Sequence, residues 1–430
     1  MEPGTRGVSS WSGWGIEEPW PNKQGRCRAT GAKIRGLISN VALSRNVASH
    51  FCPRPWHEPG QPAPGRVSRK SAALLYMLGV PGRRGVMRDG MYIVDGDGHV
   101  MDFPHRCYQK YLPEQYRRRI AFFPGAQWDR RQAPNGDLGR DPNTPQEMMA
   151  DMAQEGIDLA FLYPTSALRI GEIREAEYQT ALCRAYNDFL SDWCKADPTR
   201  LKGVAIVPYL DPTEAARELD RAVSRLGLVG LMFPTFIPGR NVADPFFWPI
   251  YAEAERLGVP VGMHASGSET GDPYRFSNFL AVHTWTHAPE QMISVISSVY
   301  GGLFEKFQRL RIGFMESGAG WVPFFMEHMD GEFEKRPWDA PLCKAKPSEY
   351  LTCGRAYFSC EPEEKTIPYV VGWVGEDNIL YASDYPHWDS EWPHTVDELL
   401  KRNDMEPRVK AKILGQNALR FYDLKAGGSR

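Results

Sequence analysis

Short apolar runs alternate with longer amphipathic stretches along most of the chain, from about residue 91 onward. Runs of four to eight apolar residues are typical of buried strands, and apolar positions three and four residues apart are typical of helices. We therefore expect strands at about 92–102, 158–164, 203–208, 229–234, 259–264, 311–316, 357–360 and 378–384. Helices are expected at about 144–155, 174–196, 211–226, 246–257, 275–307, 318–334, 395–401 and 406–422.

This alternation determines the fold class that we expect. Strands separated by helices predict a parallel sheet with right-handed crossovers. Eight such units in one domain favour an α/β fold of the (β/α)8 TIM-barrel type over an open doubly wound sheet. No glycine-rich phosphate-binding loop follows any of these strands, so the pattern does not support a nucleotide-binding fold. The polar and aromatic insertion at about 103–143 is a candidate lid, or a segment that only covers the barrel end.

The first 86 residues differ from the rest of the chain. They are basic, rich in Arg, Gly, Pro and Ser, and show no apolar period. We expect residues 1–86 to be a disordered, non-catalytic extension and residues 87–430 to form the barrel domain. The acid-free stretch 19–57 faintly resembles a transit peptide, but an extension upstream of a start at Met87 or Met91 is the simpler interpretation. A membrane or nucleic-acid tether is a third, weaker hypothesis.

Composition narrows the protein class further. An apolar content of 42% and a charged content of 24% are typical of a globular protein in water. A formal net charge of -2 gives no reason to expect nucleic acid or a membrane as a partner. The eight cysteines form no C-x-x-C pair, which favours free thiols in a reducing compartment and hence a cytoplasmic location. No apolar run approaches the roughly 18 residues needed to span a bilayer.

Polar residues stand at the carboxyl ends of several predicted strands, where the active site of such a barrel lies. The first strand carries Asp97 and His99, and later strands end in His264, Glu316 and Asp384. Each lies on the inward-facing parity of its own strand. One such residue alone is commonly a hydrogen-bonded turn residue. Three converging carboxylates, however, would repel strongly without a cation, so the set predicts a divalent metal held by oxygen and nitrogen ligands.

Five short motifs carry a family resemblance and span nearly all of the chain after the extension. They are Asp95–His99, Arg184–Asp188, Pro260–His264, Glu316–Trp321 and Ala382–His387. With them the chain resembles the amidohydrolase-related (amidohydrolase 2) family of metal-dependent barrels, which includes aminocarboxymuconate-semialdehyde decarboxylase and γ-resorcylate decarboxylase.

The resemblance implies that Asp97, His99, His264 and Asp384 bind one divalent metal ion. Zinc is the metal that we expect first, with manganese or iron as alternatives. It also implies that Asp384 takes a proton from a bound water. Asp95 lies one pleat deeper on the first strand, and for that reason we expect it to support the site without binding metal.

Glu316 departs from the family pattern, in which a histidine often stands at this position as proton donor or carbonyl polariser. A glutamate, with a reference pKa of about 4.3 against about 6.5 for histidine, is a poor acid at neutral pH unless burial raises its pKa. We therefore expect Glu316 to be catalytic as a base that orients water, or to be a further metal ligand. The substitution weakens the case for decarboxylation and leaves hydrolysis open.

Four further residues are candidates for binding a substrate. Arg275 would receive a carboxylate, Trp321 would supply an aromatic wall, and His387 would reach the pocket mouth. His283 shares a helical face with His287, for which packing is the more ordinary interpretation and substrate contact the alternative.

Together these features favour a metal-dependent hydrolase that acts through a metal-activated water on a small carbonyl or carboxylated cyclic or aromatic compound. The alternative within enzymes is a metal-dependent, non-oxidative decarboxylase of an aromatic or muconate-like acid. A catalytically degenerate ligand-binding barrel is the alternative from another class, and the intact ligand residues count against it. The family resemblance further implies a homodimer.

Overall fold

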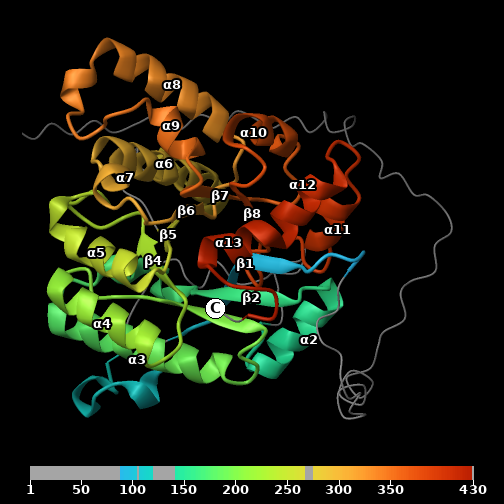
Figure 1. The fold of residues 1–430 in the computed structure, drawn as a ribbon. Helices are drawn as coiled ribbons and strands as arrows, with labels where there is room; N and C mark the ends of the chain where they lie inside the picture. The colour runs from blue at the N-terminus through green and yellow to red at the C-terminus, as the bar shows by residue number, and fades with distance from the viewer. Residues whose placement is uncertain (1–87, 104–105, 120–140, 267–274, 429–430) are drawn as a thin grey trace, which may run out of the picture. The chain divides into compact units, whose positions relative to one another are not determined.

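The computed structural model describes residues 88–103, 106–119, 141–266 and 275–428. In this part of the chain eight parallel strands follow one another in sequence order around a single sheet (Figure 1). The strands are β1 (Val94–Val100), β2 (Leu159–Pro164), β3 (Leu201–Ala205), β4 (Gly230–Pro234), β5 (Val261–His264), β6 (Ile312–Met315), β7 (Ala356–Cys360) and β8 (Ile379–Tyr381). The predicted extension, 1–86, lies outside the described residues, as does much of the insertion at 103–143.

The sheet closes between its first and last strands through backbone hydrogen bonds that lie just beyond β8. The N–H of Asp384 donates to the carbonyl of Asp97 at 3.1 Å, and the N–H of His99 donates to the carbonyl of Tyr385 at 2.8 Å. These bonds join β1 to the segment that follows β8. The predicted (β/α)8 TIM barrel is therefore confirmed.

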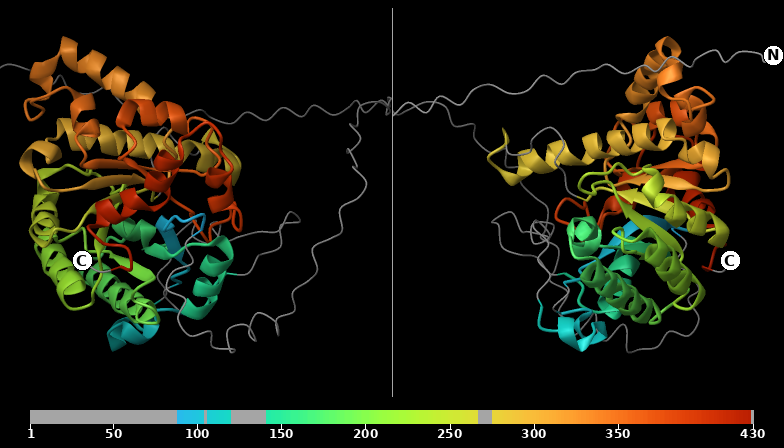
Figure 2. Two further views of the ribbon diagram at one scale, coloured as in Figure 1. Left: turned by 45° about the vertical axis from the view of Figure 1, so that its right-hand side comes forward. Right: turned by 90° about the vertical axis from the view of Figure 1, so that its left-hand side faces the viewer.

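Helices cover the outside of the strands, as two further views show (Figure 2). They are α2 (Pro145–Glu155), α3 (Ala176–Cys194), α4 (Pro212–Ser224), α5 (Trp248–Leu257), α6 (Phe279–Tyr300), α7 (Leu303–Lys306), α8 (Val322–Lys335), α9 (Pro347–Thr352), α10 (Ile367–Val374), α11 (Thr395–Leu400), α12 (Pro407–Ala411) and α13 (Asn417–Tyr422). None of the helices in these described ranges is both long enough and apolar enough to cross a bilayer.

Several helix starts follow from local sequence. Thr144 accepts a hydrogen bond from the N–H of Glu147 at 3.2 Å, and Pro145 occupies the first turn of α2. Asp211 caps α4 in the same way, because its carboxylate accepts from the N–H groups of both Thr213 and Glu214. Each side chain satisfies N–H groups that would otherwise have no partner in the first turn.

The element boundaries differ from the prediction in a few places. Helices α9 and α10 fall where we expected no element, and the predicted helix 275–307 is divided into α6 and α7 at Gly302, which has a φ of +74°. Strand β8 ends at Tyr381 and not at Asp384, whose φ of +51° is not that of an extended residue. Strand β3 covers 201–205 and so ends earlier than predicted.

The barrel interior is filled by side chains. The hydroxyls of Tyr163 and Tyr422 lie 2.7 Å apart, and Tyr422 also donates to the carbonyl of Gly96 at 3.2 Å. A Cβ placed on Gly262 would lie only 2.3 Å from the Tyr163 hydroxyl. Position 262 therefore has to lack a side chain, two residues before His264 on the same face of β5.

Candidate metal centre and active site

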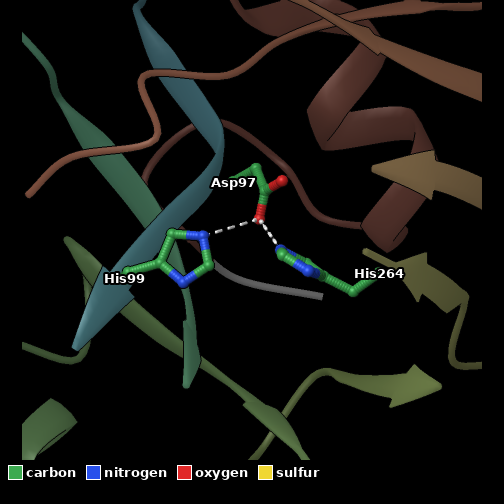
Figure 3. A group of neighbouring side chains, drawn as sticks. All are labelled: Asp97, His99 and His264. Atoms are coloured by element: carbon green, nitrogen blue, oxygen red, sulfur yellow. Dashed lines mark ion pairs between the residues drawn. The ribbon is translucent and has the colours of Figure 1, made fainter. Parts of the chain in front are cut away.

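Four side chains meet at the carboxyl ends of the strands, and we call Asp97, His99, His264 and Asp384 the ligand cluster. Asp97 Oδ1 lies 3.3 Å from His264 Nε2 and 3.7 Å from His99 Nε2 (Figure 3). His99 Nε2 lies 3.2 Å from Asp384 Oδ1. None of the four is more than 5% exposed. The structure thus brings together the residues that we predicted as metal ligands.

The outer nitrogen of each cluster histidine has a backbone partner, which determines its tautomer. His99 Nδ1 lies 2.8 Å from the carbonyl oxygen of Pro164, and His264 Nδ1 lies 2.9 Å from that of Ala265. A carbonyl oxygen only accepts, so each Nδ1 carries the proton and each Nε2 presents a lone pair to the cluster. This arrangement is typical of metal-binding histidines.

The inward atoms fit a divalent metal. Asp97 Oδ1, His99 Nε2 and His264 Nε2 are buried and have no hydrogen-bond partner among the described residues. They are all acceptors, so they repel one another unless a cation lies between them. Ligands at about 2.0–2.1 Å in a tetrahedral zinc site are separated by about 3.3 Å, close to the separations in the cluster.

Electrostatics at the two histidines differ. Burial, helped by His387, lowers the pKa of His99 to about 3 and so keeps the ring neutral. Burial also acts to lower the pKa of His264, but the carboxylates of Asp97 and Glu316 outweigh it and raise that pKa to about 9. A bound cation would oppose this rise, because it would repel a proton on the same ring.

Asp384 reaches the cluster through a strained backbone that Asp95 holds. The φ of +51° at Asp384 is uncommon for a residue with a side chain. Its neighbour Ser383 donates its N–H and its hydroxyl to the Asp95 carboxylate at 2.9 and 2.6 Å. Burial raises the pKa of Asp95 to about 7 against these hydrogen bonds. Asp95 therefore supports the strand end that carries Asp384.

Glu316 lies behind His264, outside the ligand cluster. Its Oε2 is 3.1 Å from His264 Nδ1, the nitrogen that faces away from the cluster. Its backbone has a φ of +54°, and its N–H donates to Ser359 Oγ at 2.9 Å. Burial raises the pKa of Glu316, but His264 and His287 outweigh it and hold that pKa well below its usual range. Glu316, in its carboxylate form, is thus placed to orient the ring of His264.

Comparison with known proteins assigns the family. The model of the amidohydrolase family matches residues 94–424. The chain belongs to the amidohydrolase family. The predicted resemblance and the prediction of an enzyme of this superfamily are confirmed.

Several curated relatives of this amidohydrolase are decarboxylases, and one is a 2-keto-4-carboxy-3-hexenedioate hydratase of Sphingobium. The chain is 26% identical over 286 residues to 2-amino-3-carboxymuconate-6-semialdehyde decarboxylase of Dictyostelium discoideum. That alignment covers 65% of this chain and 77% of the relative. The chain is 27% identical over 293 residues to γ-resorcylate decarboxylase of Rhodococcus jostii, which covers 64% and 85%. These relatives favour the decarboxylase alternative over the hydrolase that we expected first.

A solved structure supports the fold of this amidohydrolase. The crystal structure of 5-carboxyvanillate decarboxylase from Novosphingobium aromaticivorans aligns with a TM-score of 0.63 at 20% identity. The alignment covers 80% of this chain and all of that one, and the solved protein holds manganese and 4-hydroxy-3-methoxy-5-nitrobenzoic acid.

The predicted substrate-binding residues of this amidohydrolase lie at different depths. His387 is buried, with its ring 4.0 Å from that of His99 and its Nδ1 2.7 Å from Asp384 Oδ1. Trp321 is half-buried and donates its ring N–H to the carbonyl of Gly318. His283 lies on α6, with Nε2 3.7 Å from Asp389 Oδ2. Arg275 is exposed, next to the undescribed segment 267–274.

Two acids near the cluster were not identified from the sequence. Burial raises the pKa of Glu361 well above its usual range, and the Asp384 carboxylate adds to the rise. Asp389 behaves similarly, because burial and Asp384 raise its pKa to about 6. Glu361 directly follows β7, so the rule that selected the other strand-end residues would have found it. Asp389 lies in the loop after β8 and follows no strand directly.

Proposed function

We propose that this amidohydrolase is a metal-dependent, non-oxidative decarboxylase of a small aromatic or muconate-like carboxylic acid. The observation that carries the proposal is the ligand cluster, in which buried acceptor atoms face one another at metal-ligand spacing. The decarboxylase relatives support this reaction within the family.

Asp97, His99, His264 and Asp384 would hold one divalent ion. When bound, that ion would supply positive charge to an oxygen of the substrate beside the bond that breaks. Glu316 would orient His264 through its Nδ1. His387 and Asp95 would keep Asp384 in place, by contact with its carboxylate and through Ser383 respectively. The substrate carbon then needs a proton, because loss of carbon dioxide leaves an electron pair on it.

The remaining features of the proposal concern the metal, the assembly and the location. Zinc was our first expectation, but the manganese in the aligned structure makes manganese an equal candidate. We retain the homodimer, the cytoplasmic location and the non-catalytic extension 1–86 as proposals. We also propose that Arg275, His283, Trp321 and His387 contact the substrate.

A substrate screen with isotopic labelling tests the reaction. The full chain, reconstituted separately with zinc, manganese and iron, is incubated with hydroxy-substituted benzoates and muconate-like acids while carbon dioxide release is measured. In D2O we expect one deuterium on the carbon that lost its carboxylate, and in H2(18)O we expect no 18O in that product. Incorporation of 18O without carbon dioxide release would instead establish hydrolysis.

A further inference from the structure

Helix α6 places a second pair of imidazoles beside the site, outside the ligand cluster. His283 and His287 lie one turn apart with their rings 4.0 Å from each other. His287 Nε2 is 3.7 Å from Glu316 Oε1, whereas Glu316 Oε2 contacts His264. The His287 side chain is 23% exposed, in contrast to the fully buried ring of His264. His287 therefore combines contact with Glu316 with access from outside the cluster.

The backbone determines which nitrogen of His287 exchanges a proton. Its Nδ1 lies 3.0 Å from the carbonyl oxygen of His283 and 3.3 Å from the hydroxyl of Thr286. Because the carbonyl accepts only, Nδ1 carries a proton in both charge states of the ring. The proton that comes and goes is therefore on Nε2, the atom that faces Glu316.

Charge around the ring favours its protonated form. Burial acts to lower the pKa of His287, but the Glu316 carboxylate outweighs it and raises the pKa to about 9. The neighbouring His283 behaves in the opposite way, because burial and the charge of His287 lower its pKa to about 4. Of the two helix imidazoles, His287 is thus the one that stores a proton at neutral pH.

The chemistry of the site leaves a need for such a group. In this chain the residue that directly follows β6 is Glu316, a carboxylate that contacts His264 and His287. We propose, resting on the decarboxylase function above, that His287 is the catalytic general acid that protonates the substrate carbon and that Glu316 holds its imidazolium. The imidazole is thereby supplied by helix α6 and not by the end of strand β6.

The proposed step balances with water as the co-reactant. The bond between the substrate carbon and its carboxylate breaks, the carboxylate leaves as carbon dioxide, and the electron pair stays on carbon. That pair takes the proton from His287 Nε2, which leaves a neutral imidazole with its remaining proton on Nδ1. Water then returns one proton to Nε2, and the hydroxide that remains combines with the carbon dioxide as bicarbonate. The net change is replacement of the substrate carboxylate by hydrogen.

Two matched substitutions separate proton donation from packing. In His287→Asn the amide replaces Nδ1 and still donates to the His283 carbonyl, whereas in His287→Gln it replaces Nε2 and still contacts Glu316. Neither side chain can give up a proton. With the acid that the wild-type chain decarboxylates, we expect kcat to fall by about 10²–10⁴-fold, the range typical of a lost general acid, with metal content and KM within twofold of wild type. His328→Gln, an exposed helix histidine on α8, is the control and should retain the wild-type rate.

Chemical rescue provides a second readout. We expect added imidazole to raise the kcat of His287→Ala at least tenfold and to leave the kcat of wild type unchanged. Retention of more than a third of kcat in both amide variants would overturn the role of His287, as would a loss of metal parallel to the loss of rate. If wild type releases no carbon dioxide from any acid, the proposed function itself fails, and this inference fails with it.

Discussion

Asp95 on β1 accepts two hydrogen bonds from Ser383, which lies just beyond β8, and so binds the first strand of the barrel to the exit of the last. Further along the same two segments, the backbone bonds from Asp384 to Asp97 and from His99 to Tyr385 close the sheet. The residues that close the barrel are thus the ligand candidates or their neighbours. The contacts that close the barrel therefore also hold the ligand cluster in place.

Replacing the Asp95 carboxylate should lower both the stability of the barrel and the metal affinity of the ligand cluster. In Asp95→Asn one Ser383 group loses its acceptor in a buried setting, which costs about 1–3 kcal/mol of unfolding free energy. Because Asp384 follows Ser383, we also expect metal affinity to fall by roughly 10–100-fold, as for other residues that orient a ligand. Urea unfolding and a chelator competition measure the two effects. The exposed Asp339→Asn should change neither, and an unaltered affinity in Asp95→Asn would contradict the coupling.

Removing the metal should destabilise the whole barrel. An ion that binds only the folded state stabilises it by about 4 kcal/mol when its concentration is a thousand times its Kd. We therefore expect chelation to lower the Tm by several degrees, and readdition of metal to restore it. In His264→Gln elemental analysis should find less than a tenth of the wild-type metal, and chelator should no longer shift the Tm. Stoichiometric metal in this variant would remove His264 from the ligand set.

Glu316 should affect metal binding without being a ligand. In Glu316→Gln the side chain keeps its size but loses the negative charge beside His264 Nδ1. We expect the metal Kd to rise by about 10–100-fold while the variant still fills to one equivalent at saturating metal. Isothermal titration gives both numbers, and Glu327→Gln, exposed on α8, serves as the control. Failure to reach one equivalent would show instead that Glu316 binds the ion directly.

Gly262 provides a test of the barrel interior. In Gly262→Ala the new methyl group would meet the Tyr163 hydroxyl at 2.3 Å, which we expect to cost about 1–3 kcal/mol by overpacking. Adding Tyr163→Phe removes that hydroxyl, so the double variant should recover part of the loss. Gly331→Ala on α8, where an added Cβ meets nothing within 4 Å, should instead gain up to about 1 kcal/mol. Equal costs of Gly262→Ala with and without Tyr163→Phe would disprove the clash.

Much of this architecture could be predicted from the sequence because period and spacing are local signals. The alternation of strands and helices identified the barrel, and strand-end parity identified Asp97, His99, His264 and Asp384 as one group. The parity prediction for Glu316 was wrong, because His264 pairs in register with Met315 and Glu316 is therefore on the opposite parity of its strand. The same rule would have selected Glu361 had it been applied to the strand at 357–360.

Other features depend on geometry that parity does not contain. Parity could not tell that Glu316 faces the outer nitrogen of His264, because that depends on the φ of +54° with which the chain leaves β6. The role of His287 depends on where α6 lies against the strand ends, and helical spacing alone favoured packing. Asp389 belongs to an irregular loop, for which no periodic pattern exists.

The closure bonds join the beginning of the barrel sequence to its end, and this has a consequence for biosynthesis. On the ribosome, Asp97, His99 and His264 emerge long before Asp384 and its neighbours. A nascent chain that stops short of β8 has an open sheet and an incomplete ligand cluster. If the ligand cluster holds a metal as we propose, complete coordination therefore requires translation of the chain through Asp384.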